Sequence, residues 1–420
     1  MYQQTTLDNQ LRVATVPMPN AHSVCVGIYL AVGSRYESEA ENGASHFIEH
    51  MLFKGTKRRK AKDIANVIES VGGYSNAATG REVTHYYALV TPQHLPVALD
   101  LLSDMLLNST FQPRELERER GVIAEEINRT LDTPDDLVYE LISALEWPDS
   151  PVGRSIAGTR ETVAAMTRAS LLRFMKRHYV PGAAVVVVAG PVEHETVVSE
   201  VSRYLADWAP APAPEAPPAV PHARESRLVA EVRGTEQAQM CLSVRGVARR
   251  DPDRFAVDIL SAILGDGMGS RLFQEIRERR GLAYSVDATA SHLRDTGSLT
   301  IYAGVPPERA AEALAATIDQ LDRIRKRLVS PAELARAKEY SKGRLLLGME
   351  TPAANAGWVA SQMVQGDDVM LPEEWIAALE AVTAEDVRRV ARQLFDGAAP
   401  QLALVGPFED TEIFRPLLNL

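Results

Sequence analysis

The chain carries one sequence pattern twice, and this repeat constrains its fold more than any other feature. The repeated positions, written as pairs, are Tyr87 and Tyr302, Val90 and Val305, and Pro92 and Pro307 at an offset of 215 (302 − 87), then Pro113 and Pro331, Glu115 and Glu333, and Leu116 and Leu334 at an offset of 218 (331 − 113). Between the copies, residues 209–224 are rich in proline and alanine, which favours an extended, semi-rigid linker. Two homologous domains are therefore expected, residues 1–208 and 225–420, joined by the linker 209–224.

Within each half, strand-like and helix-like patterns alternate. Residues 24–30, 84–90 and 183–189 are rich in β-branched, aromatic or other apolar residues, as strands are. Apolar residues spaced three and four apart predict a helix over 95–107, and further helices are expected over 44–54, 62–71, 114–131 and 166–178. The predicted fold class is α+β, with a mixed or antiparallel sheet in each domain, helices packed on one face, and the two domains related by internal duplication.

Composition narrows the class of protein. The formal net charge of −11 disfavours nucleic acid and anionic membranes as partners. No apolar stretch approaches the roughly 18 residues that a membrane-spanning helix needs. The two cysteines, Cys25 and Cys241, cannot build a disulfide framework and fit a reducing compartment. Because the first residues also lack the pattern of a targeting signal, a cytoplasmic protein is expected.

The most informative motif for chemistry is the HxxEH pentad His46-Phe47-Ile48-Glu49-His50. Residues four apart project from the same face of an α-helix, so both imidazoles can reach one metal ion. Glu49 then lies close enough to act on a water molecule beside that ion. The pentad reverses the better-known HExxH order and is the signature of the inverted zinc peptidases.

A catalytic zinc site needs a third protein ligand, and the acidic helix expected over 114–131 is the obvious donor. Glu119 and Glu126 lie seven residues apart and so nearly on one helical face, which allows one to bind metal and the other to orient a ligand. Glu126 is favoured over Glu125 because it borders the face formed by Val122, Ile123 and Ile127, which is expected to be buried. The alternative is a solvated acidic face paired with arginines 118, 120 and 129.

These motifs resemble those of the pitrilysin/insulinase family of zinc metallopeptidases, most closely its short branch, which contains the mitochondrial processing peptidase and bacterial relatives. The resemblance covers nearly the whole chain and rests on residues 33–37, 43–56, 72–77, 122–127 and 270–277. In that family the third ligand follows the pentad by about 76 residues, and 126 − 50 = 76 selects Glu126, with Glu119 as the supporting carboxylate. The resemblance thus implies one Zn²⁺ per chain, held by His46, His50 and Glu126.

The same resemblance implies a zinc-dependent endopeptidase that hydrolyses peptides or unfolded polypeptide segments. Glu49 would act as general base on zinc-bound water and later return a proton to the leaving amine. The segment with Asn76, Ala77 and Ala78 would be an edge strand to which substrate adds by backbone pairing. From the residues alone, a tight turn before an ordinary strand explains that segment equally well.

The second half carries no metal chemistry at the duplicated positions, because Glu119 maps onto Ala337 and Glu126 onto Arg344. Instead, Arg277 and Tyr284 match the Arg/Tyr pair that completes the family's active site, where such donors can stabilise an oxyanion. In short family members this pair reaches the zinc of a partner subunit. The resemblance therefore implies a homodimer with composite active sites around an enclosed, hinged chamber. From the residues alone, a basic helix end followed by a core tyrosine is the alternative.

Two other functions compete with a peptidase. The first is a non-catalytic or partner-dependent subunit of a complex that resembles the processing peptidase; such subunits lack part of the pentad or its downstream glutamate, and this chain lacks neither. The second is a binding or assembly module with a structural zinc, but structural sites are usually closed by four Cys or His ligands. Presequence processing and general oligopeptide degradation would share every motif, so the sequence leaves the physiological substrate open.

Overall fold

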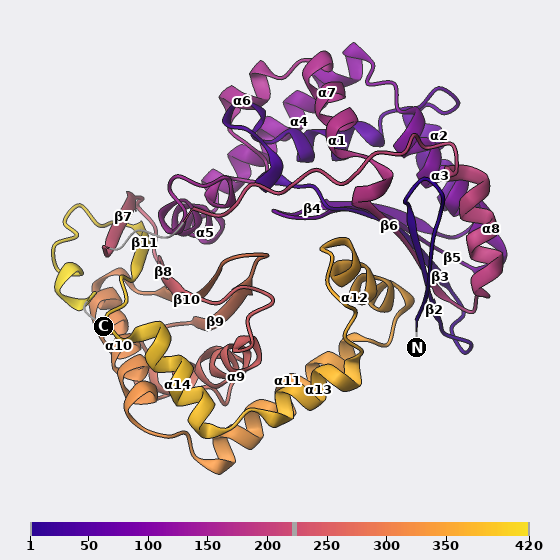
Figure 1. Ribbon diagram of the computed structural model, residues 1–420. Coiled ribbons are helices and arrows are strands. Elements are labelled where there is room, and N and C mark those ends of the chain that lie inside the picture. Colours follow the sequence, from indigo (N-terminus) through magenta and orange to yellow (C-terminus); the bar gives the residue numbers. More distant parts are fainter. Residues whose placement is uncertain (1, 221–224, 419–420) are drawn as a thin grey trace. The chain divides into compact units, whose positions relative to one another are not determined.

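The computed structural model describes residues 2–220 and 225–418, and residues 221–224 of the predicted linker lie outside that range. Contacts between Cα atoms divide the chain into two compact units (Figure 1). The first unit comprises residues 1–127, 155–217 and 346–371, and the second comprises residues 128–154, 218–345 and 372–420. In the described part of the chain, no helix is long and apolar enough to cross a membrane.

The first unit is built on a six-stranded mixed sheet in the order β1-β2-β6-β3-β5-β4. Its strands are β1 (Gln3–Thr6), β2 (Arg12–Pro17), β3 (Val24–Leu30), β4 (Tyr74–Thr79), β5 (Thr84–Val90) and β6 (Ala184–Gly190). Neighbouring strands are antiparallel except β2 and β6, which run parallel. Every residue of the central strands β3 and β6 is buried, which explains why both read as continuous apolar runs. β4 forms one edge of the sheet.

Most helices of the first unit pack on one face of this sheet. They are α1 (Ala44–Leu52), α2 (Ala61–Glu69), α3 (Leu95–Asn108), α4 (Pro113–Asp132), α6 (Arg160–Ala165), α7 (Arg168–His178) and α8 (His194–Leu205). Alternate residues of the strands, such as Val26, Ile28 and Val186, form one buried cluster with Phe47 of α1 and Leu99 of α3. This packing fixes α1 against the sheet and leaves the polar side of α1 free for the site described below.

The second unit repeats this topology with the five-stranded order β7-β11-β8-β10-β9. The strands are β7 (Arg227–Val232), β8 (Ala238–Arg245), β9 (Ser285–His292), β10 (Gly297–Val305) and β11 (Gln401–Gly406), and the helices that belong with them are α9 (Arg254–Gly265), α10 (Ala310–Lys326), α11 (Pro331–Gly348), α13 (Pro372–Ala381) and α14 (Ala384–Phe395). β7 and β11 are the parallel pair, as β2 and β6 are in the first sheet. The order without β1 is therefore the same in both sheets, which confirms the predicted α+β fold and its internal duplication.

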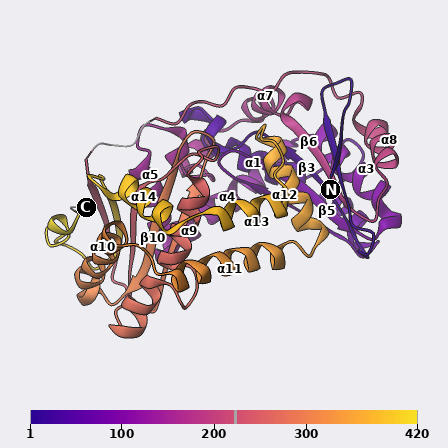
Figure 2. The same cartoon turned by 60° about the horizontal axis from the view of Figure 1, so that its bottom comes forward.

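The second face of each sheet is covered by one helix. In both units this helix comes from the opposite half of the sequence to most of the strands that it covers. α12 (Pro352–Val364) packs on β6, β3 and β2 of the first sheet, as seen in Figure 2, whereas α5 (Pro134–Glu146) packs on β11 and β8 of the second. Small residues such as Ala356 and Ala360 bring α12 close to Cys25 and Val187. This exchange of helices was not predicted from the sequence, because the periodicity of a helix does not reveal which sheet it covers.

Candidate metal and catalytic site

The start of α1 is held by a buried carboxylate. Glu37 accepts hydrogen bonds from the backbone N–H groups of Gly43 and Ser45, each at 2.7 Å, and one from the Asn42 side chain at 3.2 Å. Gly43 has a φ of 95°, and a Cβ there would lie 2.6 Å from the carbonyl oxygen of Ala157. Glycine is therefore required at this position, and Glu37 satisfies N–H groups that a helix start leaves without partners.

The helix α1 divides its residues between the core and the site. Phe47, Ile48 and Met51 are buried, which leaves the two histidines and Glu49 on the partly exposed side. The imidazole rings of His46 and His50 lie 4.7 Å apart between centroids. The two rings are therefore neighbours, as expected for residues four positions apart on one face of a helix.

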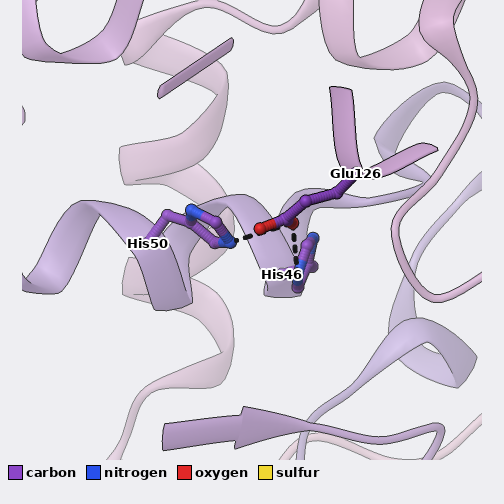
Figure 3. Close-up of side chains that lie close together, drawn as sticks. All are labelled: His46, His50 and Glu126. Carbon is purple, nitrogen blue, oxygen red and sulfur yellow. Dashed lines mark ion pairs between the residues drawn. The ribbon is translucent and has the colours of Figure 1, made fainter. Parts of the chain in front are cut away.

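Glu126 of α4 brings a carboxylate between these rings (Figure 3). Its Oε2 atom lies 3.6 Å from Nε2 of His46 and 3.4 Å from Nε2 of His50. One ligand atom from each of the three residues lies within 4.8 Å of the others. Tetrahedral zinc with bonds of about 2.0–2.2 Å places neighbouring ligand atoms about 3.3–3.6 Å apart. Both distances from Oε2 of Glu126 to the imidazole nitrogens match this spacing, and two imidazoles with a carboxylate are a donor set that suits zinc.

Glu119 and Lys54 form the polar support behind His50. Nδ1 of His50 lies 3.2 Å from Oε2 of Glu119, and the other oxygen of Glu119 lies 2.9 Å from the ammonium of Lys54. The Glu119 side chain is 2% exposed. A carboxylate on the far nitrogen of a histidine orients the ring and fixes which nitrogen faces a metal. Nδ1 of His46, in contrast, is buried and has no hydrogen-bond partner among the described residues.

The prediction that Val122 lies on a buried face of α4 beside Glu126 is wrong. Val122 is 40% exposed, whereas Ile123 and Ile127 are buried as expected. The buried face of α4 is therefore narrower than predicted, because α4 lies at the surface and its exposed side also carries an apolar residue. Glu126 still borders that face, and Glu125 is exposed.

Glu49 faces the strand β4. Its Oε2 atom accepts a hydrogen bond from the hydroxyl of Thr79, the last residue of β4. Burial raises the pKa of Glu49 above its usual range, against the opposing effects of the Thr79 hydrogen bond and of His50.

Burial lowers the pKa of His46 to about 4, and the neighbouring His50 contributes in the same direction. The His46 imidazole is therefore neutral at physiological pH. A neutral imidazole is the form that binds a metal.

The predicted substrate-binding residues Asn76, Ala77 and Ala78 lie on β4, which is paired with β5 on one side only. Along β4 the exposure alternates, so Asn76 and Ala78 are exposed and Ala77 and Thr79 are half-buried. An unpaired strand edge with small side chains can accept a further strand. The alternative from sequence, an ordinary strand after a turn, does not require an edge position.

In the second unit, Arg277 and Tyr284 lie side by side. Arg277 belongs to a π-helical segment, Phe273–Arg279, and its guanidinium carbon lies 5.1 Å from the centre of the Tyr284 ring. Tyr284 is 71% exposed, so it is not the core tyrosine of the alternative interpretation. Arg271 anchors the start of this segment to α11 through two hydrogen bonds to Glu333, at 2.6 and 2.9 Å.

Three residues with a clear place in the site were not singled out from the sequence. They are Glu37, Lys54 and Thr79, which hold α1, Glu119 and Glu49, respectively. Glu37 and Lys54 stand inside motifs that carried the family resemblance, and Thr79 lies two residues beyond such a motif. The roles of Lys54 and Thr79 depend on contacts with residues far away in the sequence, and that of Glu37 depends on how the chain turns into α1, which a motif does not specify.

Comparison with known proteins agrees with this geometry. Residues 12–160 match the family model described as insulinase (peptidase family M16), and residues 165–340 match the model described as peptidase M16 inactive domain. An uncharacterized zinc protease of Streptomyces coelicolor is 40% identical over 98% of this chain and 91% of its own length.

Two solved structures resemble the chain over nearly all its length. A protease from Helicobacter pylori has a TM-score of 0.91 at 25% identity and covers 97% of this chain and 99% of its own. A chain of Complex III2 from Candida albicans has a TM-score of 0.87 at 19% identity, covers 99% of both chains, and shows a shared fold. The matched family models, the identity with a zinc protease and the grouped His46, His50 and Glu126 lead to one conclusion: the chain belongs to the insulinase family, peptidase family M16, of zinc proteases.

Proposed function

We propose that this protein is a zinc-dependent endopeptidase that hydrolyses peptides or unfolded polypeptide segments, with one Zn²⁺ per chain. The observation that carries the proposal is the convergence of His46, His50 and Glu126 beside the carboxylate of Glu49. Three protein ligands leave a fourth position for water or substrate, as catalytic zinc sites do and structural sites do not.

A zinc ion bound by these residues would supply Lewis acidity toward a water molecule and the scissile carbonyl. Glu49 accepts a proton from the water and then donates one to the leaving amine. Thr79 holds the Glu49 carboxylate in place through its hydroxyl. Glu119 orients His50, and Lys54 balances the charge of Glu119. These contacts therefore hold the carboxylate of Glu49, the ring of His50 and the charges of Glu119 and Lys54 in defined positions.

In this proposal the substrate pairs with the free edge of β4. Main-chain hydrogen bonds would hold an extended peptide along Asn76, Ala77 and Ala78, while alternate side chains of the peptide point to opposite faces of the sheet. Thr79 ends this strand and bonds to Glu49, so a peptide paired there passes close to the general base.

The second unit would take part in catalysis through assembly with a partner subunit. Arg277 and Tyr284 would stabilise the oxyanion and hold the substrate backbone in the active site of a partner subunit, which requires a homodimer with composite sites around a hinged chamber. The exposure of Tyr284 and its stacking against Arg277 support a role for the pair at a surface. A cytoplasmic location stays a prediction.

A chelator-reversible peptidase assay tests the proposed function. Purified protein is incubated with unstructured peptides, and the products are identified by mass spectrometry before chelation, after chelation and after zinc is added back. We expect internal cleavage that chelation abolishes and stoichiometric zinc restores. Zinc binding without cleavage of any peptide would favour a non-catalytic subunit or a module with a structural zinc. Because cleavage sites are mapped, the same assay describes the substrate preference.

Mixing two inactive variants tests the composite sites. Glu49→Gln removes the base of one subunit, and Tyr284→Phe removes a donor that is worth about 10²–10³ in kcat at comparable sites. If the sites are shared, a heterodimer holds one intact site, so an equal mixture that exchanges subunits should recover about a quarter of wild-type activity in a two-fold symmetric dimer. Recovery is measured after refolding the two variants together and, as a control, separately. No recovery despite subunit exchange would mean that each site is made within one chain.

A further inference from the structure

A cavity lies in the first unit, on the face of the sheet away from α1. It has a volume of about 550 Å³ and lies between α12 and the strands β3, β5 and β4. Ala78, Thr79 and the following Gly80 line it at the edge of the sheet, and Ala353 and Gly357 line it on α12. Its size falls within the range of about 300–1,000 Å³ that is typical of ligand sites.

Aromatic rings form the wall of this cavity. Tyr29 of β3 stacks on His85 of β5 with ring centroids 5.1 Å apart, and His85 stacks on Tyr87 at 5.9 Å. Tyr29 is 6% exposed, so the row has a fixed base in the sheet. Parallel rings at these distances offer flat apolar surface and a preferred geometry for another ring.

The cavity carries no formal charge of its own. Among the described residues that line it, none is Asp, Glu, Lys or Arg. Burial lowers the pKa of His85, so this imidazole is neutral at physiological pH. A charged side chain would lose its hydration there without gaining a partner, whereas an apolar side chain would gain from leaving water.

The alternation of β4 connects the cavity to the edge where substrate would pair. Ala77 and Thr79 are half-buried, and Thr79 turns toward Glu49. Ala78 lies opposite His85 in the strand pairing, on the face that the cavity occupies. A peptide strand added to β4 would follow the same two-residue period, so every second side chain would point toward the cavity.

From this geometry we propose that the cavity is a specificity pocket for one bulky apolar side chain, preferably an aromatic one, of the peptide that pairs with β4. The proposal rests on the proposed peptidase function and adds to it the class of substrate side chain that is selected. The selected position is one whose side chain points away from α1, so it is separate from the neighbouring positions that face Glu49. Gly357 and Ala353 determine the depth of the pocket, because larger residues there would fill it.

Gly357 offers a direct test. A Cβ at this position would lie 3.8 Å from the Tyr29 hydroxyl, an ordinary contact, so a larger side chain can enter the cavity without a backbone clash. The variants Gly357→Ala and Gly357→Leu fill it in two steps, and Ala353→Leu fills it from a second position if Gly357→Leu does not fold. Gly343→Leu on α11 is the matched control, since a Cβ there meets open space in the described part of the chain.

Each variant is assayed against one peptide library, and the residues on both sides of every cleaved bond are counted. For the wild type we expect aromatic residues to be enriched at one position. Gly357→Leu should lower kcat/KM for peptides with an aromatic residue there roughly tenfold or more relative to peptides with alanine, which is the scale of discrimination of an apolar pocket. Gly357→Ala should have a smaller effect, and Gly343→Leu should leave the profile unchanged.

The results distinguish failure of the specificity pocket from failure of the peptidase function. If the wild type cleaves no peptide, the peptidase function fails and the pocket fails with it. If the wild type cleaves peptides but the profiles of Gly357→Leu and Ala353→Leu match that of the wild type, only the pocket is overturned. A uniform loss of activity at all positions, with no change in the profile, also overturns it, because a filled specificity pocket must act on one position.

Discussion

Replacement of Glu49 by glutamine is expected to lower kcat by about 10²–10⁴-fold or more while the protein keeps its zinc. Glutamine has nearly the shape of glutamate and can still accept a hydrogen bond from Thr79, but it cannot take a proton from water. Glu49 is not among the three grouped ligand residues, so metal content should stay near one zinc ion per chain. The measurement combines steady-state peptide cleavage with elemental analysis of the purified variant.

Glu125→Gln is the matched control for this substitution. Glu125 is an exposed residue of α4 and stands next to the proposed ligand Glu126 in the sequence, so its replacement makes the same chemical change outside the pentad. We expect wild-type zinc content and nearly wild-type turnover. Full activity in Glu49→Gln would remove the general base from the mechanism, and loss of zinc from Glu49→Gln would show that the carboxylate belongs to the metal site instead.

Replacement of His50 by alanine is expected to abolish both zinc binding and peptide cleavage. His50 has two contacts in the site, since its Nε2 lies 3.4 Å from Glu126 and its Nδ1 lies 3.2 Å from Glu119. Alanine removes one of the three ligands and also leaves the buried Glu119 carboxylate without its imidazole partner. Loss of a supporting residue alone typically costs 10–100-fold in metal affinity, and loss of a ligand should cost more.

Zinc content after dialysis and activity at saturating zinc measure this effect. His22→Ala is the control, because His22 is exposed and lies outside the pentad. We expect less than about a tenth of the wild-type zinc in His50→Ala, by the affinity argument above, and full zinc in His22→Ala. A His50→Ala protein that binds zinc as tightly as the wild type would contradict the assigned ligand set, whatever its activity.

Much of the fold follows from local patterns in the sequence. The helix expected over 95–107 is α3, Leu95–Asn108, and the helix expected over 114–131 is α4, Pro113–Asp132. The strand expected over 183–189 is β6, Ala184–Gly190. The two helices are long and periodic and the strand is a continuous β-branched run, so neighbouring residues were enough to identify them. The duplication was also visible, because two copies of one topology keep some residues at equal spacing.

The placement of α5 and α12 could not be read in the same way. α12 contains Ala356, Val359, Ala360 and Met363, an apolar face that fits any flat apolar surface equally well. That it covers β3 and β6 of the first sheet depends on contacts between segments far apart in the chain. The cavity beside β4 arises from this placement, so no pattern in the sequence indicated it.

The sequence by itself determined which side chains α1 presents together, because the pitch of a helix fixes the separation of His46 and His50. Through the spacing shared with the family, it also predicted Glu126 as the third ligand and Glu119 as the supporting carboxylate. Only the tertiary structure decided how closely Glu126 approaches both rings, that Glu119 contacts Nδ1 of His50, and that Thr79 holds Glu49. The physical reason is that a local repeat fixes directions along one helix, whereas distances between two helices and a strand are set by how their apolar faces pack.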